Sequence, residues 1–104
     1  MSKYKMTTFG EHIRILREEA MLPLRKVAED IGIDTSLLGK IERNNRQPTK
    51  EQIKLIAKFF KLDEKELLKE FISDQIAYKI LEEEADLDTL KVAEMKIEYL
   101  KSKK

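Results

Sequence analysis

The chain has 104 residues, enough for one small domain or for one domain with a short appendage. Charged residues make up 39% of it, only three glycines and two prolines are present, and cysteine is absent. This composition predicts a helix-rich protein and excludes disulfide bonds, thiol nucleophiles and cysteine-ligated zinc. We expect a cytoplasmic protein, because no hydrophobic leader and no apolar run of membrane-spanning length is present.

The net charge of +1 is unevenly distributed along the chain. Residues 1–62 carry 13 lysines and arginines against 8 acidic residues, whereas residues 63–104 carry 8 against 12. A basic front and an acidic back are typical of a phosphate-facing module followed by a separate interaction segment. Helices rich in lysine and glutamate also scatter charge unevenly by chance, so both interpretations stay open.

The first predicted helix runs from Phe9 to about Ala20. Thr8 and Glu11 have the spacing of a capping box, in which each side chain bonds the backbone N–H of the other residue. A row of apolar residues at helical spacing supports the helix: Phe9, Ile13, Leu16 and Ala20. His12, the only histidine, is expected to be an ordinary surface residue or a single phosphate contact. Residues 1–7 are expected to be a disordered arm.

Two short helices joined by a tight turn are predicted between Leu24 and Arg46. Apolar residues of the first helix form one stripe, which consists of Val27, Ala28 and Ile31. Gly32 is expected to end this helix, because a residue that tolerates positive φ fits best just past a helix end. Asp34 is expected to cap the next helix by accepting hydrogen bonds from its unpaired backbone N–H groups.

The second of these helices, from about Thr35 to Arg43, has two different sides, and we call it the reading helix. Leu38 and Ile41 lie three residues apart and are expected to point inward. Small, hydrogen-bonding and basic residues are left on the outer side: Thr35, Ser36, Gly39, Lys40 and Arg43. A helix with such an outer side, braced by a shorter helix, suits insertion into the major groove of DNA.

These helices and their flanks resemble the helix-turn-helix of the Cro/CI repressor family, the XRE-type regulators, over roughly residues 9–68. The resemblance is carried by Ala28, Gly32, Ile33, Leu38, Ile41, Glu42, Arg46 and Pro48. It implies an all-α fold: a five-helix phage-repressor-like DNA-binding domain with a helix-turn-helix over residues 1–72, followed by a C-terminal helical extension over residues 73–104.

The first two helices both follow and depart from the family pattern. The resemblance implies a partly buried ion pair between Arg17 and Glu42 that locks the first helix to the reading helix. Met21 stands where the family usually has glycine, and Pro23 and Leu24 replace the usual Ser/Thr-Gln. Leucine cannot make the hydrogen bonds of that glutamine, so phosphate contacts are expected to fall to neighbouring basic residues.

The resemblance also implies how the chain contacts DNA. Base edges are expected to be approached by Thr35, Ser36 and Lys40. Gly39 would let the helix come close to the groove, and Leu37 would contact the backbone or a thymine methyl group. Lys40 donates only and would therefore prefer guanine. Phosphate contacts are expected from Arg25, Lys26, Arg43, Asn45 and Arg46.

Three more helices are predicted after Pro48. Thr49 is expected to cap the first of them, whose buried face consists of Ile53, Ile56, Ala57 and Phe60. Asp63 begins the next helix, which either stops at Ser73-Asp74 or continues through Ile76 and Ile80. The last helix is expected to be capped by Asp86 or Asp88 and to carry the apolar positions Leu90, Ala93, Ile97 and Leu100.

The C-terminal helices either fold back onto the first domain or associate with a second copy. Self-association is favoured, because they carry more apolar surface than two isolated helices can hide and because such readers usually bind paired half-sites. The expected dimerisation residues are Phe71, Ile72, Ile76, Ile80, Leu90, Ile97 and Leu100.

The predicted function is that of a transcriptional regulator, of the repressor or restriction–modification controller type, which binds a palindromic operator in double-stranded DNA as a homodimer. The alternative is an antitoxin that occupies a toxin protein through its C-terminal helices and regulates its own operon. Catalysis is not expected, because the sequence has no cysteine, one histidine and no glycine-rich phosphate loop. No metal, cofactor or membrane partner is indicated.

Overall fold

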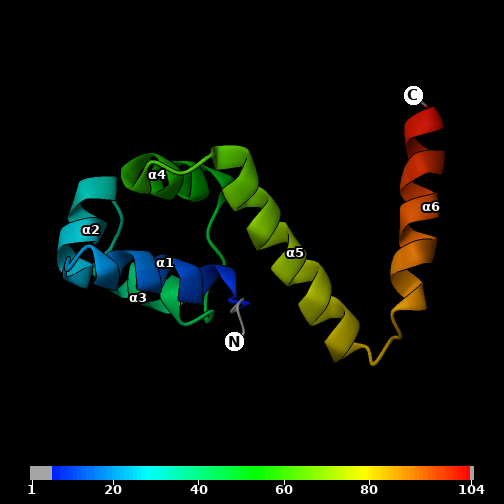
Figure 1. The fold of residues 1–104 in the computed structure, drawn as a ribbon, viewed down its shortest axis with the longest axis horizontal. Helices are drawn as coiled ribbons and strands as arrows, with labels where there is room; N and C mark the ends of the chain where they lie inside the picture. The colour runs from blue at the N-terminus through cyan, green and yellow to red at the C-terminus, as the bar shows by residue number, and fades with distance from the viewer. Residues whose placement is uncertain (1–5, 104) are drawn as a thin grey trace. The chain divides into compact units, whose positions relative to one another are not determined.

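The computed structural model describes residues 6–103, and within this range the chain forms six α-helices and no strand (Figure 1). The helices are α1 (Phe9–Glu19), α2 (Leu24–Ile31), α3 (Thr35–Glu42), α4 (Lys50–Phe60), α5 (Glu64–Glu82) and α6 (Asp88–Ser102). The all-α fold class is therefore confirmed. The expected N-terminal arm lies almost entirely outside the described residues. Nothing over residues 6–103 forms a helix long and apolar enough to cross a membrane.

The chain divides into two compact units, Met1–Asp74 and Gln75–Lys104. In the first unit, α1 and α3 lie side by side, and α2 packs against both α3 and α4 (Figure 1). The buried core draws on all of its helices and consists of Phe9, Ile13, Val27, Ala28, Ile31, Leu38, Ile41, Ile53, Ile56, Ala57 and Leu67. The inward faces predicted for α2 and α3 are confirmed, whereas Phe60 of α4 is only half-buried.

Two of the four predicted helix caps form as expected. The Thr8 hydroxyl accepts the Glu11 N–H, and the Thr8 N–H donates to the Glu11 carboxylate, so both halves of the capping box are present. Thr49 and Gln52 form a second box at the start of α4. Asp63 also caps α5, because its Oδ1 accepts the backbone N–H of two residues in the first turn.

The other caps are not made by the expected carboxylates. Asp34 stands at the N-cap position of α3 but bonds no backbone N–H, because its Oδ2 accepts the Ser36 hydroxyl at 2.7 Å. α6 begins at Asp88, and its N-cap position is held by Leu87 with no side-chain hydrogen bond. At the start of α6, the backbone carbonyl of Asp86 accepts the Thr89 N–H at 3.1 Å. Within residues 6–103, the Asp86 carboxylate contacts only the Thr89 hydroxyl, at 3.5 Å.

Met21 adopts the left-handed conformation that makes glycine usual at its position. Its φ is 59°, and its side chain is 88% exposed. Because a Cβ crowds the following carbonyl in this region, methionine costs about 1 kcal/mol relative to glycine here. The departure from the family pattern thus leaves the backbone turn intact and places an apolar side chain in solvent.

Gly10 sets how closely α1 approaches α3, a role that the sequence analysis missed. A Cβ on this residue would lie 2.5 Å from the carbonyl oxygen of Ile41 and 2.6 Å from that of Glu42. These distances are too short for any real contact, and the opposing atoms belong to the backbone, which cannot turn aside as a side chain can. The absence of a side chain at residue 10 is therefore required by the packing of α1 on the end of α3.

α5 runs through Ser73 and Asp74 without interruption, so the longer of the two predicted alternatives is correct. Phe71 packs edge-on against Phe9 with 5.6 Å between ring centroids and is half-buried, and its part in dimerisation stays a prediction. His12 is not an ordinary surface residue, because its Nδ1 lies 2.8 Å from Glu70 Oε1 and both side chains are partly buried.

No residue of α6, which belongs to the second unit, is buried. Leu90 is 41% exposed, Ile97 52% and Leu100 58%. Ile76 of α5 is exposed as well, and Ile80 is half-buried. Within the second unit, these apolar side chains therefore stay largely uncovered.

Candidate nucleic-acid interface

The turn between α2 and α3 is built on a left-handed glycine, as predicted. Gly32 has a φ of 78°, and its N–H donates to the Ala28 and Glu29 carbonyls at the end of α2. The following N–H, that of Ile33, also bonds the Ala28 carbonyl at 3.0 Å. These bonds satisfy the last carbonyls of α2. They also turn the chain sharply, so that α3 runs in a different direction and packs against α2.

A buried ion pair holds α3 to α1, as the resemblance implied. Arg17 Nε lies 2.7 Å from Glu42 Oε2, and Arg17 Nη2 lies 3.0 Å from Glu42 Oε1, so the contact is bidentate. The Glu42 side chain is 4% exposed and that of Arg17 is 14% exposed. The hydrogen bond to Glu42 raises the pKa of Arg17 and so favours its charged form further. Arg17 also donates to the Leu22 carbonyl at 2.9 Å.

The outer side of the reading helix differs in part from the prediction. Ser36, Lys40 and Arg43 are exposed, whereas Thr35 and Leu37 are half-buried. Gly39 is buried, because Leu24 and Arg43 cover it: a Cβ there would lie 3.3 Å from a terminal atom of each side chain. The small size of Gly39 thus serves the contact between α2 and α3, and the close approach to the groove expected at Gly39 stays a prediction.

Basic and amide side chains surround the reading helix on two sides. Arg25 and Lys26 are exposed in the first turn of α2, but Lys26 lies 3.5 Å from Asp30 in an ion pair within the helix. Asn45 and Arg46 are exposed in the loop after α3. Two of the cations that flank α3, Arg25 and Arg46, therefore form no ion pair with a described residue.

Asn44 shapes this loop and was missed by the sequence analysis. It has a φ of 62°, and its side-chain amide donates to the Thr8 hydroxyl at 2.9 Å. The next N–H, that of Asn45, bonds the Lys40 carbonyl at 2.8 Å and closes the end of α3. Asparagine is the non-glycine residue that most readily accepts this conformation, so an asparagine just past a predicted helix was an available signal.

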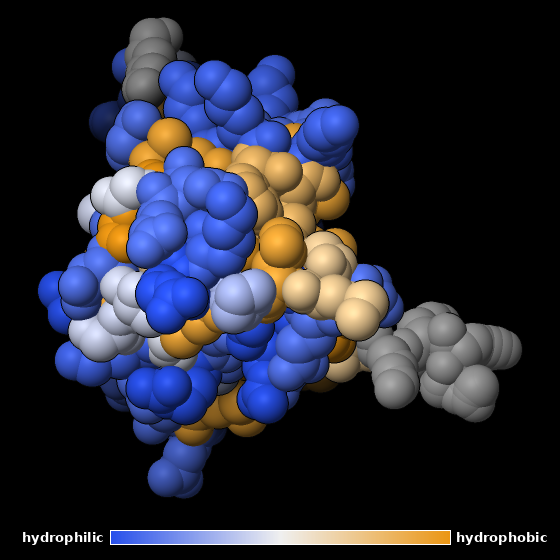
Figure 2. All heavy atoms as spheres, turned by 90° about the vertical axis from the view of Figure 1, so that its left-hand side faces the viewer, coloured by the Kyte–Doolittle hydropathy of each residue, from blue (hydrophilic) through white to orange (hydrophobic). Residues whose placement is uncertain are grey.

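Hydrophilic residues cover most of the face seen in Figure 2, and hydrophobic residues are exposed only in patches between them.

The hydroxyl of Ser36 donates its proton to the Asp34 carboxylate, so only the lone pairs of its oxygen remain available for another hydrogen bond. In the absence of DNA, the reading helix therefore offers an acceptor at Ser36 and donors at Lys40 and Arg43.

The comparisons with known proteins agree with this arrangement. The family model described as helix-turn-helix matches residues 13–67, which includes the whole of α2 and α3. The comparison with curated proteins found no match. A crystal structure of the restriction–modification controller protein C.AhdI from Aeromonas hydrophila is 30% identical, with a TM-score of 0.53, and the match covers 57% of this chain and 89% of that chain.

Two further solved structures share the fold at lower identity. The SinR protein/SinI protein complex is 20% identical, with a TM-score of 0.55, and the match covers 91% of this chain and 99% of that chain. The clp gene regulator ClgR from Corynebacterium glutamicum is also 20% identical, with a TM-score of 0.54, and the match covers 85% of this chain and 88% of that chain.

A glycine-turned pair of helices, locked to α1 by a buried ion pair and flanked by exposed cations, defines a helix-turn-helix DNA-binding protein. The chain belongs to the XRE-type helix-turn-helix family of Cro/CI regulators, and it is a DNA-binding transcriptional regulator.

Proposed function

We propose that the chain acts as a homodimer that binds a palindromic operator in double-stranded DNA, as a repressor or as a restriction–modification controller. The observation that carries this proposal is the exposed face of α3, where Ser36, Lys40 and Arg43 stand clear of the core on a helix fixed by a buried ion pair. A rigid helix with exposed donors can enter the major groove without reordering. The identity to C.AhdI, itself described as a restriction–modification controller, favours that type.

Recognition is divided between base edges and phosphates. Lys40 and Ser36 are proposed to approach base edges, with Thr35 and Leu37 beside them at the half-buried margin of the contact. Phosphates are proposed to be held by exposed residues around α3: Arg25, Lys26, Arg43, Asn45 and Arg46. Phosphate contacts fix the position of the protein on the duplex, whereas base contacts select the sequence.

Replacing Lys40 by alanine is expected to lower affinity for the operator by about 1–3 kcal/mol while leaving binding to random DNA nearly unchanged. Arg46→Ala is expected to weaken binding to both DNAs alike and to reduce the slope of log affinity against log salt by about 1. The measurement is fluorescence anisotropy at several salt concentrations, on an operator first selected from a random DNA library.

Lys54→Ala is the matched control, because Lys54 is also an exposed lysine and lies on α4. It should change neither the operator preference nor the salt slope beyond a small fraction of the Arg46 effect. The proposal fails if the selected operator binds no more tightly than random DNA. It also fails if Lys40→Ala lowers both affinities by the same factor.

Dimerisation is proposed to use the C-terminal helical extension, residues 73–104, together with Ile72. The apolar residues that support it are exposed or half-buried: Ile72, Ile76, Ile80, Leu90, Ile97 and Leu100. On α6, Leu90, Ile97 and Leu100 share one face, because they are spaced seven and three residues apart. An exposed apolar row of this kind is covered in a stable protein by a partner, and a second copy of the chain supplies the same row.

Leu90→Asp is expected to convert the dimer to a monomer in analytical ultracentrifugation, because each copy would place a charge in the apolar contact. Val92→Asp is the matched control: Val92 is 43% exposed on the opposite face of the same helix, so the same charge there should leave the dimer intact. A wild-type monomer at micromolar concentration, or equal effects of the two substitutions, would contradict the proposed contact.

The alternative is an antitoxin, and one observation favours it. α6 carries a second exposed apolar row, Val92, Met95 and Tyr99, on the face away from Leu90. A two-fold contact through Leu90 leaves this row open to a different protein. Co-expression with the product of the adjacent gene separates the two functions, because an antitoxin would elute with that product and suppress its toxicity, whereas a regulator that acts alone would elute as a dimer.

A further inference from the structure

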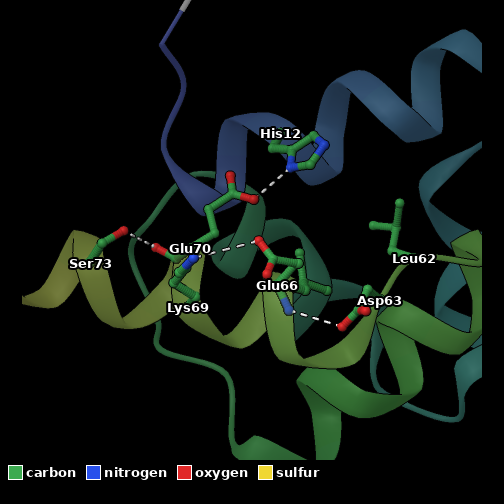
Figure 3. Close-up of a pocket in the computed structure, with 8 residues that line it drawn as sticks. His12, Leu62, Asp63, Glu66, Lys69, Glu70 and Ser73 are labelled. Carbon is green, nitrogen blue, oxygen red and sulfur yellow. Dashed lines mark hydrogen bonds and ion pairs between the residues drawn. The ribbon is translucent and has the colours of Figure 1, made fainter.

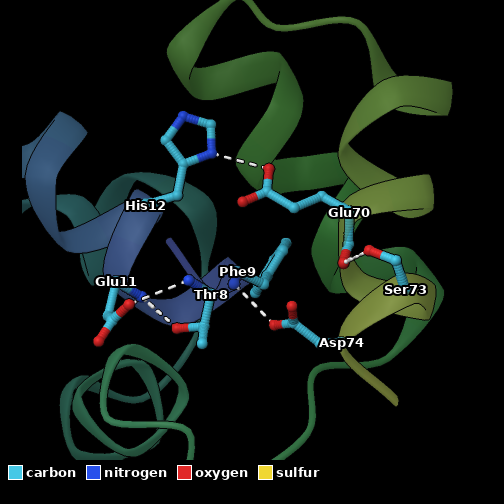
Figure 4. A network of polar contacts seen from close by, with 7 residues as sticks. All are labelled: Thr8, Phe9, Glu11, His12, Glu70, Ser73 and Asp74. Carbon is cyan, nitrogen blue, oxygen red and sulfur yellow. Dashed lines mark hydrogen bonds and ion pairs between the residues drawn. The ribbon is translucent and has the colours of Figure 1, made fainter. Parts of the chain in front are cut away.

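Among the described residues, three contacts join α5 to the first turn of α1. Asp74 Oδ2 accepts the backbone N–H of Phe9 at 2.7 Å, and Glu70 Oε1 lies 2.8 Å from His12 Nδ1 (Figure 4). The Phe71 ring meets the Phe9 ring edge-on. We call these five residues the latch.

The Asp74 contact completes the start of α1. Thr8 already accepts the Glu11 N–H through its hydroxyl and the His12 N–H through its carbonyl. The N–H of Phe9, the first residue of the helix, is another of the four donors that a helix start leaves unpaired, and Asp74 accepts it from 65 residues away. A carboxylate at this end also interacts favourably with the helix dipole.

The latch is concentrated at one place along α5. An open groove with a volume of about 530 Å³ lies beside the latch: His12 and Glu70 line it, together with Leu62 and Asp63 before α5 and residues of α5 as far as Ser73 (Figure 3). Leu67 is buried in the core, but residues 63–69 make no polar contact to α1 among the described residues. The side-chain bonds that tie α5 to α1 therefore come from Glu70 and Asp74.

α5 continues from the latch as one helix to Glu82, and Ile76 and Ile80 follow directly. We propose that the latch is a positioning device: it holds α5 against the start of α1 within the first unit and thereby narrows the range of half-site spacings that a dimer can occupy. This inference rests on the proposed function. His12 and Asp74 are positioning residues and are not proposed to touch DNA.

The prediction concerns spacing more than affinity. A dimer with fixed reading helices accepts half-sites one helical turn apart and rejects other spacings, because one base pair more or less rotates one site around the duplex axis. A dimer without the latch still binds the operator. Binding of its second reading helix to the second half-site depends less on the spacing, because a flexible connection between the two reading helices samples many geometries. Purely structural residues would lower affinity at all spacings by one common factor.

The experiment measures affinity for operators whose half-sites are moved apart or together by one or two base pairs. The wild type is expected to prefer its best spacing by on the order of tenfold or more over its neighbours. Asp74→Ala and His12→Ala are expected to reduce this preference severalfold, with the dimer retained in ultracentrifugation. Asp74→Asn should restore most of it, because the asparagine carbonyl can still accept the Phe9 N–H.

Ser73→Ala is the matched control, because the Ser73 hydroxyl is exposed and bonds only the Glu70 carbonyl of its own helix. It should keep the wild-type preference. The latch is refuted if Asp74→Ala and His12→Ala keep that preference, or if they weaken all spacings equally. If instead the wild type binds a single half-site as tightly as a pair, the proposed dimeric recognition fails, and that result is distinct from a failure of the latch alone.

Discussion

Replacing Arg17 by methionine is expected to destabilise the protein by about 3–5 kcal/mol, the typical cost of leaving a buried charge without its partner. The substitution would strand the Glu42 carboxylate, whose side chain is 4% exposed, with no other partner among the described contacts. It would also remove the donor to the Leu22 carbonyl. Urea unfolding followed by circular dichroism measures the loss.

The two halves of the ion pair are not expected to contribute equally. Glu42→Met leaves Arg17 with the Leu22 carbonyl and a longer, more exposed side chain, so it should cost less than Arg17→Met. The double variant Arg17→Met with Glu42→Met should be more stable than Arg17→Met alone, because no buried charge remains unpaired. Strict additivity of the two single changes in this cycle would show that the pair is not coupled.

Gly10→Ala is expected to destabilise the protein by about 2–3 kcal/mol, although alanine favours helix formation by about 1 kcal/mol over glycine. The added methyl group would press on the carbonyl oxygens of Ile41 and Glu42, and the only relief is to move α1 away from α3. Because Glu42 also belongs to the ion pair, that movement would weaken both contacts. Thermal unfolding compared with the wild type tests this.

Gly39→Ala is the matched control for a buried helical glycine. Its Cβ would lie 3.3 Å from Leu24 Cδ2 and from Arg43 Nη1, which are ends of flexible side chains that can shift slightly. The net effect should stay within about 1 kcal/mol of zero, since the gain in helix propensity offsets the crowding. Equal destabilisation by Gly10→Ala and Gly39→Ala would contradict the assignment of a special close approach to Gly10.

The parts of the fold that depend on local sequence were predictable. The capping boxes at Thr8 and Thr49 and the left-handed Gly32 involve residues within four positions of one another, so their geometry follows from spacing alone. The Arg17–Glu42 pair joins residues 25 apart, and it was accessible only because the family resemblance supplied the partner.

The predictions that the structure corrected involve either a side chain with two competing hydrogen-bond partners or a contact between residues far apart in the sequence. Asp34 was expected to cap α3, but the hydroxyl of Ser36 two residues later competes for the same carboxylate. The burial of Gly39 depends on Leu24, which lies on a different helix. His12 finds Glu70 at a separation of 58 residues, and no periodic pattern indicates which helix will lie beside it.

The latch has a consequence for how the protein is made. A ribosome adds roughly 5–20 residues per second, so the 65 residues between Phe9 and Asp74 take about 3–13 seconds to follow. During that interval α1 through α4 can emerge, but the first N–H of α1 has no carboxylate to bond. The nascent chain therefore gains this last hydrogen bond at the start of α1 only when Asp74, in the middle of α5, has been added.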